Sequence, residues 1–458
     1  DIELGEIKTE PYYNLEFSKI NIRPNEPKQF DFELIDSNPF LTIEPKVYTG
    51  KSSDYFKPTM INKNVWFGNV FKFGESRIYS ILSFVNFDFI SELTNYMCTE
   101  VFTKFLNKKI EKVFYLASEI GFHTSLSLNS DSSTLNISIY GYNDKFTDYF
   151  NYVMDYLKDF NYKEEDKVIL EAIFNEMKDD YSNIKNKNPW SYRSYLESLN
   201  VNKNSYKIDE IVSFLKSFTV ESFVNKLNEI KNIILYNSKF TSFFYGNTTK
   251  EYLFSKDALN LTFLKSIDRP KNVLKKLTDI DVKHPNKDEK DNYVQLSFMI
   301  GKFYPIQNLL LLVLAITISQ KFYDVLRTKK QFGYLVSANR QRIQDNYYFV
   351  ERVESKKTIK EIESAIIDFN NNFLDTISEE EFEKFVETSK KLLQEKENNT
   401  RELYSKYAEE IIDEKFLFDR EDLLLRQIDN IDFKMFKKFY KEKVKNAVAV
   451  KVYIHGNK

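Results

Sequence analysis

The chain has 458 residues, 42% of them apolar, and its 41 Phe and 30 Tyr are enough to fill the cores of two or three domains. Lys and Arg total 66 against 68 Asp and Glu, a formal net charge of -2, which leaves no general basic field for a nucleic-acid backbone. Nucleic acid is therefore excluded as the main partner. The single cysteine, Cys98, cannot form an intrachain disulfide, and it favours the cytoplasm or another reducing compartment.

The first 58 residues differ from the rest of the chain. They carry six of its ten prolines, which interrupt any long helix: Pro11, Pro24, Pro27, Pro39, Pro45 and Pro58. Residues 1–58 are therefore predicted to form an extended linker. The chain begins at Asp1 without a methionine or a secretory signal, so we expect it to start partway along a longer protein.

A first repeat is predicted over residues 59–268. The pair Gly121-Phe122 is followed by two segments of β type, residues 125–128 and 135–140, which a polar turn joins. A helix is then predicted from apolar residues at i, i+3, i+4 and i+7, namely Phe150, Val153, Met154 and Leu157. After a closing strand, residues 269–290 show little periodicity and are predicted to be a connector.

A second repeat is predicted over residues 291–458, because its landmarks recur at nearly one offset. The pair Gly333-Tyr334 comes 212 residues after the first Gly-aromatic pair (334 − 122 = 212), and the closing Gly-Asn pairs are 210 residues apart (457 − 247 = 210). Strands are predicted at 335–337 and 347–350. A helical stripe follows, formed by Ile359, Ile362, Ile366 and Phe369.

Two further patterns in the second repeat predict helices. Ser378, with Glu381 three residues later, has the spacing of a capping box that opens a helix. The longest apolar stretch, residues 309–318, has about half the length that a membrane span needs, so it predicts a buried helix and no membrane span. The fold class that follows is α+β: two homologous domains, each an antiparallel-rich sheet covered by helices, after an extended linker.

Four motifs resemble segments of one peptidase family. Residues 326–334, Leu-Arg-Thr-Lys-Lys-Gln-Phe-Gly-Tyr, are similar to the Leu-Arg-Thr-Lys-x-Gln-Leu-Gly-Tyr run of insulin-degrading enzyme and its relatives, the M16 family of inverzincin zinc metallopeptidases, with Phe332 in place of Leu. Residues 140–145, 246–250 and 418–420 resemble other segments of these proteins, in the family's order. The resemblance implies the linker, third domain and fourth domain, which form the C-terminal half of such an enzyme.

The family's metal site is not visible in this sequence. A zinc peptidase needs three protein ligands and a water, and in this family the motif is His-x-x-Glu-His. The only histidines are His123, His284 and His455, which are too far apart for two imidazoles on one helix face. His123 and His455 are predicted to be strand residues and His284 a solvated loop residue. We expect no metal or cofactor site in this chain and Zn²⁺ in the N-terminal half of the parent protein.

Two residues of the long motif are the candidate site. Arg327 is predicted near the end of a helix, Gly333 at a left-handed position that ends it, and Tyr334 at the start of the next strand. Taken without the family, both are more simply a surface charge and an ordinary strand residue. The resemblance implies that Tyr334 stabilises the oxyanion of a scissile peptide bond and that Arg327 contacts the substrate backbone.

Two functions remain open. The first is the zinc-free half of an insulin-degrading-enzyme-like metalloendopeptidase that hydrolyses peptides enclosed in a chamber, inactive by itself. The alternative is a non-catalytic peptide-binding or assembly protein of the same superfamily. The partners implied are the N-terminal catalytic half and peptide substrates, and a homo-oligomer is left open. The presence of both Arg327 and Tyr334 favours the first function, because a protein without catalysis has no chemical need for the pair.

Overall fold

The computed structural model describes residues 6–19, 37–42, 45–50, 57–255 and 259–457. The chain divides into two compact units, residues 1–39 and 40–458. In the first unit, β1 (Ile7–Thr9) pairs antiparallel with β2 (Glu16–Ser18). Residues 1–5, 20–36, 43–44 and 51–56 of the predicted linker lie outside the described residues.

The second unit begins with an aromatic contact inside the range predicted as linker. Phe40 is 7% exposed, and its ring centre lies 6.1 Å from that of Phe122 and 5.2 Å from that of Tyr149. Phe40 is therefore part of the first hydrophobic core.

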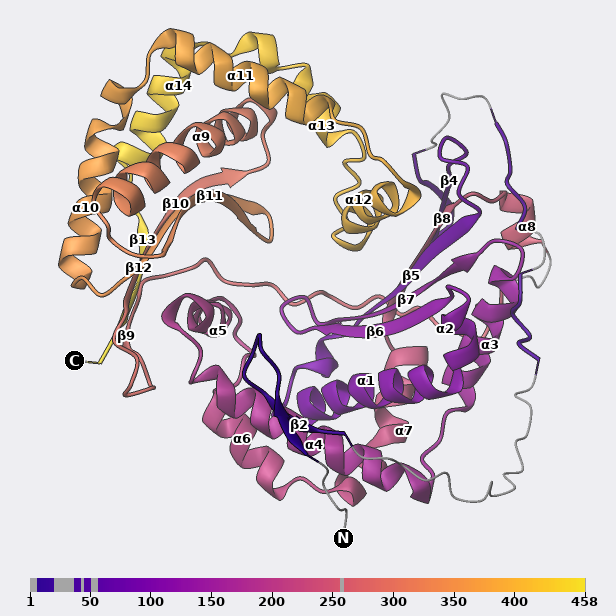
Figure 1. Cartoon of the computed structure of the whole chain (residues 1–458). Coiled ribbons are helices and arrows are strands. Elements are labelled where there is room, and N and C mark those ends of the chain that lie inside the picture. The colour runs from indigo at the N-terminus through magenta and orange to yellow at the C-terminus, as the bar shows by residue number, and fades with distance from the viewer. Residues whose placement is uncertain (1–5, 20–36, 43–44, 51–56, 256–258, 458) are drawn as a thin grey trace. The chain divides into compact units, whose positions relative to one another are not determined.

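The first repeat contains a six-stranded sheet with helices on one face (Figure 1). The strand order is β3-β4-β8-β5-β7-β6. The strands are β3 (Thr59–Asn62), β4 (Val65–Asn69), β5 (Arg77–Val85), β6 (His123–Asn129), β7 (Thr134–Tyr142) and β8 (Lys239–Gly246). The helices are α1 (Leu93–Val113), α2 (Tyr115–Glu119), α3 (Phe146–Asp159), α4 (Lys167–Ile184), α5 (Pro189–Val201), α6 (Ile208–Ser217), α7 (Val220–Tyr236) and α8 (Lys250–Phe254).

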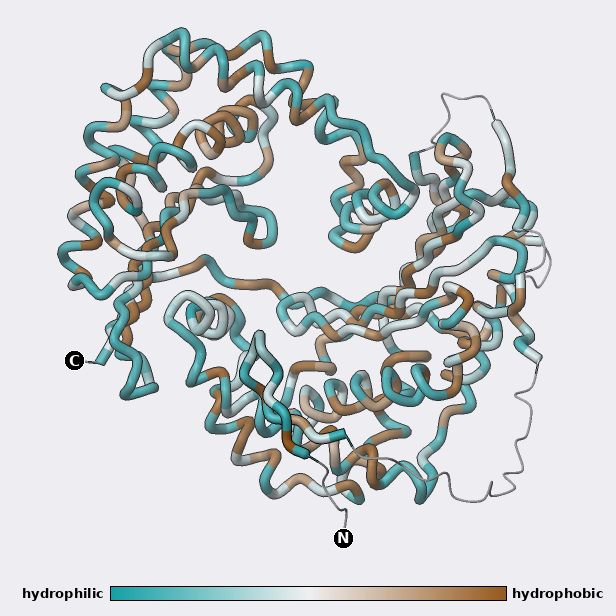
Figure 2. The backbone as a smooth tube through the Cα atoms, viewed as in Figure 1, coloured by the Kyte–Doolittle hydropathy of each residue, from teal (hydrophilic) through white to brown (hydrophobic). Residues whose placement is uncertain are grey.

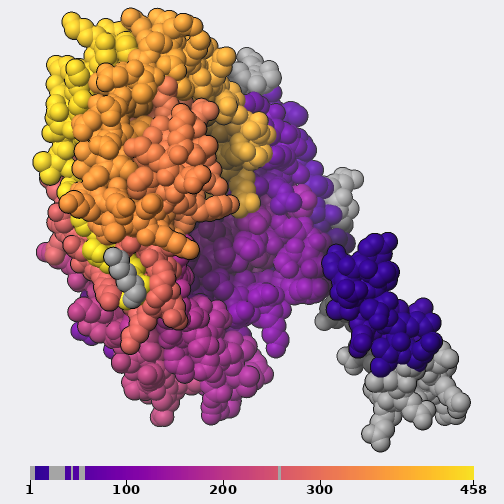
Figure 3. Space-filling view, turned by 60° about the vertical axis from the view of Figure 1, so that its left-hand side comes forward, coloured from indigo at the N-terminus to yellow at the C-terminus, as the bar shows by residue number. Residues whose placement is uncertain are grey.

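The second repeat contains a five-stranded sheet in the order β11-β12-β10-β13-β9. The strands are β9 (Ile280–Lys283), β10 (Asn292–Lys302), β11 (Leu335–Ile343), β12 (Asn346–Ser355) and β13 (Val450–His455). The helices are α9 (Pro305–Tyr323), α10 (Ile359–Asn372), α11 (Glu379–Gln394), α12 (Thr400–Ile412), α13 (Arg420–Leu425) and α14 (Phe433–Tyr440). Figure 3 shows the yellow C-terminal segment packed against the orange helices of this repeat.

The two repeats have the same topology, which confirms two homologous α+β domains with antiparallel-rich sheets. Apart from β3, which pairs antiparallel with β4 and occurs only in the first sheet, the strand order is the same. The strand that closes each repeat, β8 or β13, pairs parallel with β4 or β9 and antiparallel with β5 or β10. Strand β9 lies inside the segment predicted as a connector, residues 269–290. The domain boundaries themselves stay predictions.

Local patterns explain where several of these helices begin and which face they bury. The predicted stripe of α3 is buried: Phe150, Val153, Met154 and Leu157 are all at most 3% exposed. Helix α11 begins at the predicted capping box, in which the Glu381 amide donates to Ser378 Oγ over 3.1 Å. Both helices are amphipathic. The apolar side packs on a sheet or a neighbouring helix, and the polar side faces solvent.

Helix α9 is apolar on every side and lies in the second core. Figure 2 shows it largely brown, whereas α11 alternates between brown and teal. The segment Pro305–Lys329 is long and apolar enough to cross a membrane by length and composition, but 61% of its most apolar window is buried inside the protein. Leu309, Leu311 and Leu314 are 0% exposed in the core cluster, as expected for a core helix that neighbours enclose.

Each sheet is also covered on its second face by a helix of the other repeat. Helix α12 places Leu403, Tyr407, Ala408 and Ile411 on Phe243 and Tyr245 of β8. Helix α5 places Tyr192 and Val201 on Tyr293 of β10 and on Val452 and Ile454 of β13. These two helices begin at equivalent positions (400 − 189 = 211). Because helices cover both faces of the first sheet, residues 78–85 of β5 are all buried, without the alternation of a strand that has one face in solvent.

Candidate functional site

Arg327 and Tyr334 lie on either side of the junction between α9 and β11. Helix α9 continues into a π-helix, η3 (Asp324–Lys329), and β11 begins at Leu335. Leu326 is 0% exposed and anchors η3 in the core. The amide of Phe332 donates to the Leu326 carbonyl over 2.9 Å and so closes the turn. Since a π-helix adds a residue to the usual turn, it shifts the side chains that follow, and such segments are frequent at functional sites.

The structure brings the two predicted site residues into contact. The guanidinium carbon of Arg327 lies 4.3 Å from the ring centre of Tyr334 and 4.7 Å from that of Tyr323. Arg327 also donates a hydrogen bond to the Tyr323 hydroxyl. Contact with two aromatic rings restricts the orientation of the guanidinium, and cation–π attraction stabilises the arrangement.

Tyr334 is 78% exposed, which is unusual for a large aromatic side chain at the start of a strand. The equivalent residue of the first repeat, Phe122, is 1% exposed and packs on Tyr149 with ring centres 4.9 Å apart. The aromatic residue of the Gly-aromatic pair is therefore part of the core in the first repeat and faces solvent in the second. Among the hydrogen bonds of the described residues, none involves the Tyr334 hydroxyl, so this donor is available to a ligand.

The role predicted for Gly333 is wrong. Gln331, and not Gly333, has the left-handed conformation after the helix, with φ 51°. Gly333 is required for a different reason: a Cβ there would lie 2.1 Å from the carbonyl oxygen of Glu354 on β12. The glycine allows the chain to pass close to the neighbouring strand before β11 begins. Gly333 thereby sets the position of Tyr334 immediately before β11.

The three histidines lie in separate environments. His123 stacks on Tyr140 with ring centres 4.9 Å apart, and burial lowers its pKa below the usual range, with Arg401 adding to the effect. His455 contacts Asp281 over 2.8 Å. The prediction of a solvated His284 is wrong, because it is 3% exposed: its Nε2 donates to the Lys187 carbonyl over 3.0 Å, and its Nδ1 accepts from the Asn286 amide over 3.2 Å. Sequence reasoning missed this burial because Lys187 lies 97 positions away in the chain, in the first repeat.

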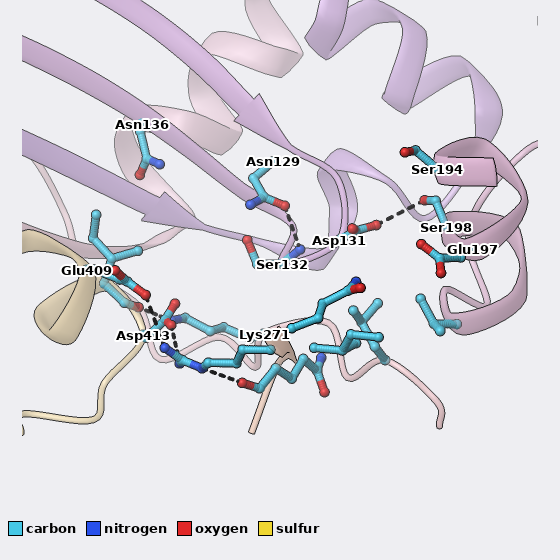
Figure 4. A pocket seen from close by; sticks show the side chains of 17 residues that line it. Asn129, Asp131, Ser132, Asn136, Ser194, Glu197, Ser198, Lys271, Glu409 and Asp413 are labelled. Carbon is cyan, nitrogen blue, oxygen red and sulfur yellow. Dashed lines mark hydrogen bonds and ion pairs between the residues drawn. The ribbon is translucent and has the colours of Figure 1, made fainter. Parts of the chain in front are cut away.

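A polar cavity that the sequence did not predict lies between the repeats (Figure 4). It has a volume of about 450 Å³ and is lined by the β6–β7 and β11–β12 turns, α5, α12 and residues 271–274. Several of its polar groups contact one another: Arg342 contacts Glu409 over 3.1 Å and Asp413 over 2.5 Å, and Ser198 donates to Asp131 over 3.2 Å. The contacts of Arg342 lie within the second repeat, and the contact of Ser198 lies within the first. Five separate segments line the cavity, so no single motif could reveal it.

No group of three or more His, Cys, Asp or Glu side chains that could hold a metal occurs in the part of the chain that the structure describes. The donor set needed for a catalytic zinc is three protein ligands. The described residues therefore do not fit a zinc ion, and no chemical step can be assigned to a metal held by them.

Two family models and several known proteins are similar to this chain in sequence. Residues 3–213 match the family described as the middle or third domain of peptidase M16, and residues 313–409 match the C-terminal lobe domain 4 of PQQ synthase PqqF-like proteins. The chain is 25% identical to the Drosophila melanogaster insulin-degrading enzyme over 338 residues, 69% of this chain and 33% of that protein. It is 24% identical to an Arabidopsis thaliana nardilysin-like protein, over 80% of this chain and 37% of that protein.

Solved structures share the fold. The chain superposes on pitrilysin with a TM-score of 0.76 at 14% identity, covering 92% of this chain and 45% of that one. A protease from Helicobacter pylori aligns with a TM-score of 0.60 at 13% identity, over 88% of this chain and 99% of that one. The chain spans only 33% to 42% of the length of the curated relatives it matches. Together the two family models, the relatives and the solved structures support an insulin-degrading-enzyme-like member of the M16 peptidase family.

Proposed function

We propose that the chain is the zinc-free half of an insulin-degrading-enzyme-like metalloendopeptidase. In this proposal an N-terminal half of the same protein supplies the zinc, and the two halves enclose a peptide substrate. Tyr334 donates a hydrogen bond to the oxyanion that develops on the scissile carbonyl, and Arg327 holds the substrate backbone beside it.

The observation that carries the proposal is the contact between Arg327 and the exposed Tyr334. The guanidinium lies 4.3 Å from the ring centre of Tyr334, and the side chain of Tyr334 is 78% exposed. Among the described residues the Tyr334 hydroxyl has no hydrogen-bond partner, so it can donate to developing negative charge without first breaking another bond. Removing one such donor typically costs about 10²–10³ in rate.

The division of labour is tested by reconstitution. This chain alone should hold no stoichiometric zinc and should not cleave a fluorogenic peptide, and both properties should appear when the N-terminal half is added. Zinc content is measured on the separated and the mixed halves, together with the rate of cleavage. Cleavage by this chain alone would contradict the proposal.

The alternative is a parent protein that binds peptides or assembles with other proteins without cleaving them. It is supported by the likeness in fold to a Pseudomonas fluorescens structure described as a peptidase M16 inactive domain, with a TM-score of 0.65 at 10% identity. The two functions differ in the reconstitution experiment. A reconstituted protein that binds the peptide without cleaving it would favour the alternative.

A further inference from the structure

The two sheets present their edge strands differently. Strand β6 is the edge of the first sheet, and β11 is the edge of the second; each pairs with one neighbour, β7 or β12 (Figure 1). An edge strand has alternate backbone N–H and C=O groups that point away from the sheet and can pair with another chain. The fold therefore has to cover these groups or leave them available.

Strand β6 is closed by a side chain of helix α1. Asn107 donates through Nδ2 to the Leu126 carbonyl over 2.9 Å, and its Oδ1 accepts from the Leu126 amide over 2.8 Å. The carboxamide takes both outward groups of Leu126, as a neighbouring strand would. A chain approaching β6 would have to displace these two bonds.

Strand β11 has no such closure. The residues equivalent to Leu126 and Asn107 are Ala338 (338 − 126 = 212) and Ser319 (319 − 107 = 212), and a serine is too short to imitate the carboxamide. Within the residues that the structure describes, the backbone of residues 335–343 has β12 as its only hydrogen-bonding partner. At this position the two homologous edges differ in one side chain, and among the described residues the backbone of β11 has no side-chain hydrogen bond of the kind that Asn107 makes to β6.

We infer that β11 binds an extended peptide segment, which adds to the second sheet as a further strand. The inference deepens the proposed function and rests on it for the identity of the peptide as substrate. Strand β11 begins one residue after Tyr334, so a peptide paired with it continues directly from the Arg327–Tyr334 contact. At about 3.3 Å per residue, the strand from Leu335 to Arg340 guides roughly 17 Å of peptide.

The charge at the far end of this edge favours a peptide that carries a carboxylate. Arg340 is exposed, and the ion pairs among the described residues do not include it. It lines a cavity of about 450 Å³ in which the other cations are paired: Arg420 contacts Glu410 over 2.6 Å, and Lys406 contacts Glu421 over 2.7 Å. A carboxylate of the peptide would give Arg340 a partner without separating an existing pair.

Backbone hydrogen exchange tests the inference on this chain alone, without zinc. The probe is a fluorescein-labelled peptide of about twelve residues that alternates Thr and Val and has one Glu near an end. We expect it to protect the amides of residues 335–343 from exchange. A matched peptide with alternate amides N-methylated should not, because it cannot pair along the edge. Protection elsewhere with β11 unprotected, or equal binding of both peptides, would overturn the inference.

Exchanging the closing side chain gives a second test. Ser319→Asn should close β11 and weaken probe binding roughly tenfold, in line with two lost hydrogen bonds. Gln320→Asn, an exposed position one residue along the same helix, should bind the probe like the unchanged chain. Equal weakening by both variants would overturn the inference. A peptide with Lys in place of Glu should bind more weakly, and equal affinity would overturn the carboxylate preference.

These outcomes are separate from those of the proposed function. Loss of the oxyanion role would appear as an unchanged kcat when the Tyr334 hydroxyl is removed, and it would leave protection of residues 335–343 in place. Failure of the edge inference would appear as an unprotected β11 in a chain that still supports cleavage when reconstituted.

Discussion

The guanidinium of Arg327 is stacked on the ring of Tyr334, with 4.3 Å between the guanidinium carbon and the ring centre. The two residues are seven positions apart in the chain (334 − 327 = 7), and a π-helix, a left-handed Gln331 and Gly333 bring them together. The backbone between them is therefore as much a part of the candidate site as the two side chains.

Arg327→Lys should lower kcat/KM of the reconstituted peptidase by about 10- to 100-fold although the charge is retained. Lysine has no planar group to stack on the rings of Tyr323 and Tyr334, so it would not hold a peptide backbone in one orientation. Steady-state kinetics on a fluorogenic peptide measure the change. Lys329→Ala, which removes an exposed cation of the same turn, is the control and should have little effect. An unchanged kcat/KM in Arg327→Lys would indicate that the positive charge alone is sufficient.

Gly333→Ala should destabilise the protein by ~1–3 kcal/mol, because its Cβ would lie 2.1 Å from the Glu354 carbonyl oxygen and the strands must move apart. The free energy of unfolding, measured with urea, should fall. Hydrogen exchange should locate the change at the start of β11. Gly74→Ala tests for a different cause: Gly74 has a left-handed φ of 62° but no atom within 4 Å of the added Cβ, so its cost should come from backbone strain alone. Unchanged exchange in β11 of Gly333→Ala would contradict the account.

Glu351 should make stability depend on pH. It is 0% exposed, and desolvation raises its pKa to about 8, against a smaller opposing effect of the Asn370 amide, which donates to it over 2.7 Å. Tyr440, whose hydroxyl donates to Asn370, is the other titratable group facing it. The folded protein therefore holds a proton that the unfolded chain releases above its ordinary pKa near 4.5.

Because the folded protein keeps this proton, its stability should fall as the pH rises. The free energy of unfolding should be highest below about pH 4.5 for this group and should fall as the pH rises toward 8, by ~5 kcal/mol in total. Glu351→Gln should remove most of this decline and should stabilise the protein at pH 8. Urea unfolding at several pH values measures it, with the exposed Glu383→Gln as control. If the Glu351→Gln variant kept the pH profile of the unchanged chain, Glu351 would not be the group responsible.

Ile411→Ala should destabilise the first domain although Ile411 belongs to the second repeat. Its side chain is 1% exposed on α12, in the cluster with Phe243 and Tyr245 of β8. Losing a buried branched side chain costs ~2–5 kcal/mol. Hydrogen exchange should quicken in β8 as well as in α12. Ile367→Ala, at a residue 44% exposed on α10, should have a small effect. A change confined to α12 would contradict the exchange of helices between the repeats.

The sequence predicted those parts of the fold that short-range patterns determine. The stripe of α3, the capping box at Ser378 and the common offset of the two Gly-aromatic pairs all depend on residues close in the chain, and all agree with the structure. The proximity of Arg327 and Tyr334 was predicted for the same reason, because one short turn joins them.

Features that depend on distant partners were not predictable. His284 is buried by a carbonyl 97 positions away, and α5 and α12 each cover the sheet of the other repeat. The reason for Gly333 is the carbonyl of Glu354 on the neighbouring strand, which no local pattern of glycine reveals. The closure of β6 by Asn107 is a side-chain contact across a helix and a strand, and an asparagine in a helix is no signal of it.

The central claim is tested most directly by removing one oxygen atom, in the Tyr334→Phe variant of the reconstituted peptidase. The ring and its contact with Arg327 are retained, and only the hydroxyl donor is lost. We predict that kcat falls by about 10²–10³ while KM changes much less. Tyr304→Phe, which removes an exposed tyrosine hydroxyl at the start of α9, should leave kcat nearly unchanged. A kcat of Tyr334→Phe equal to that of the unchanged protein would contradict the proposed role of Tyr334.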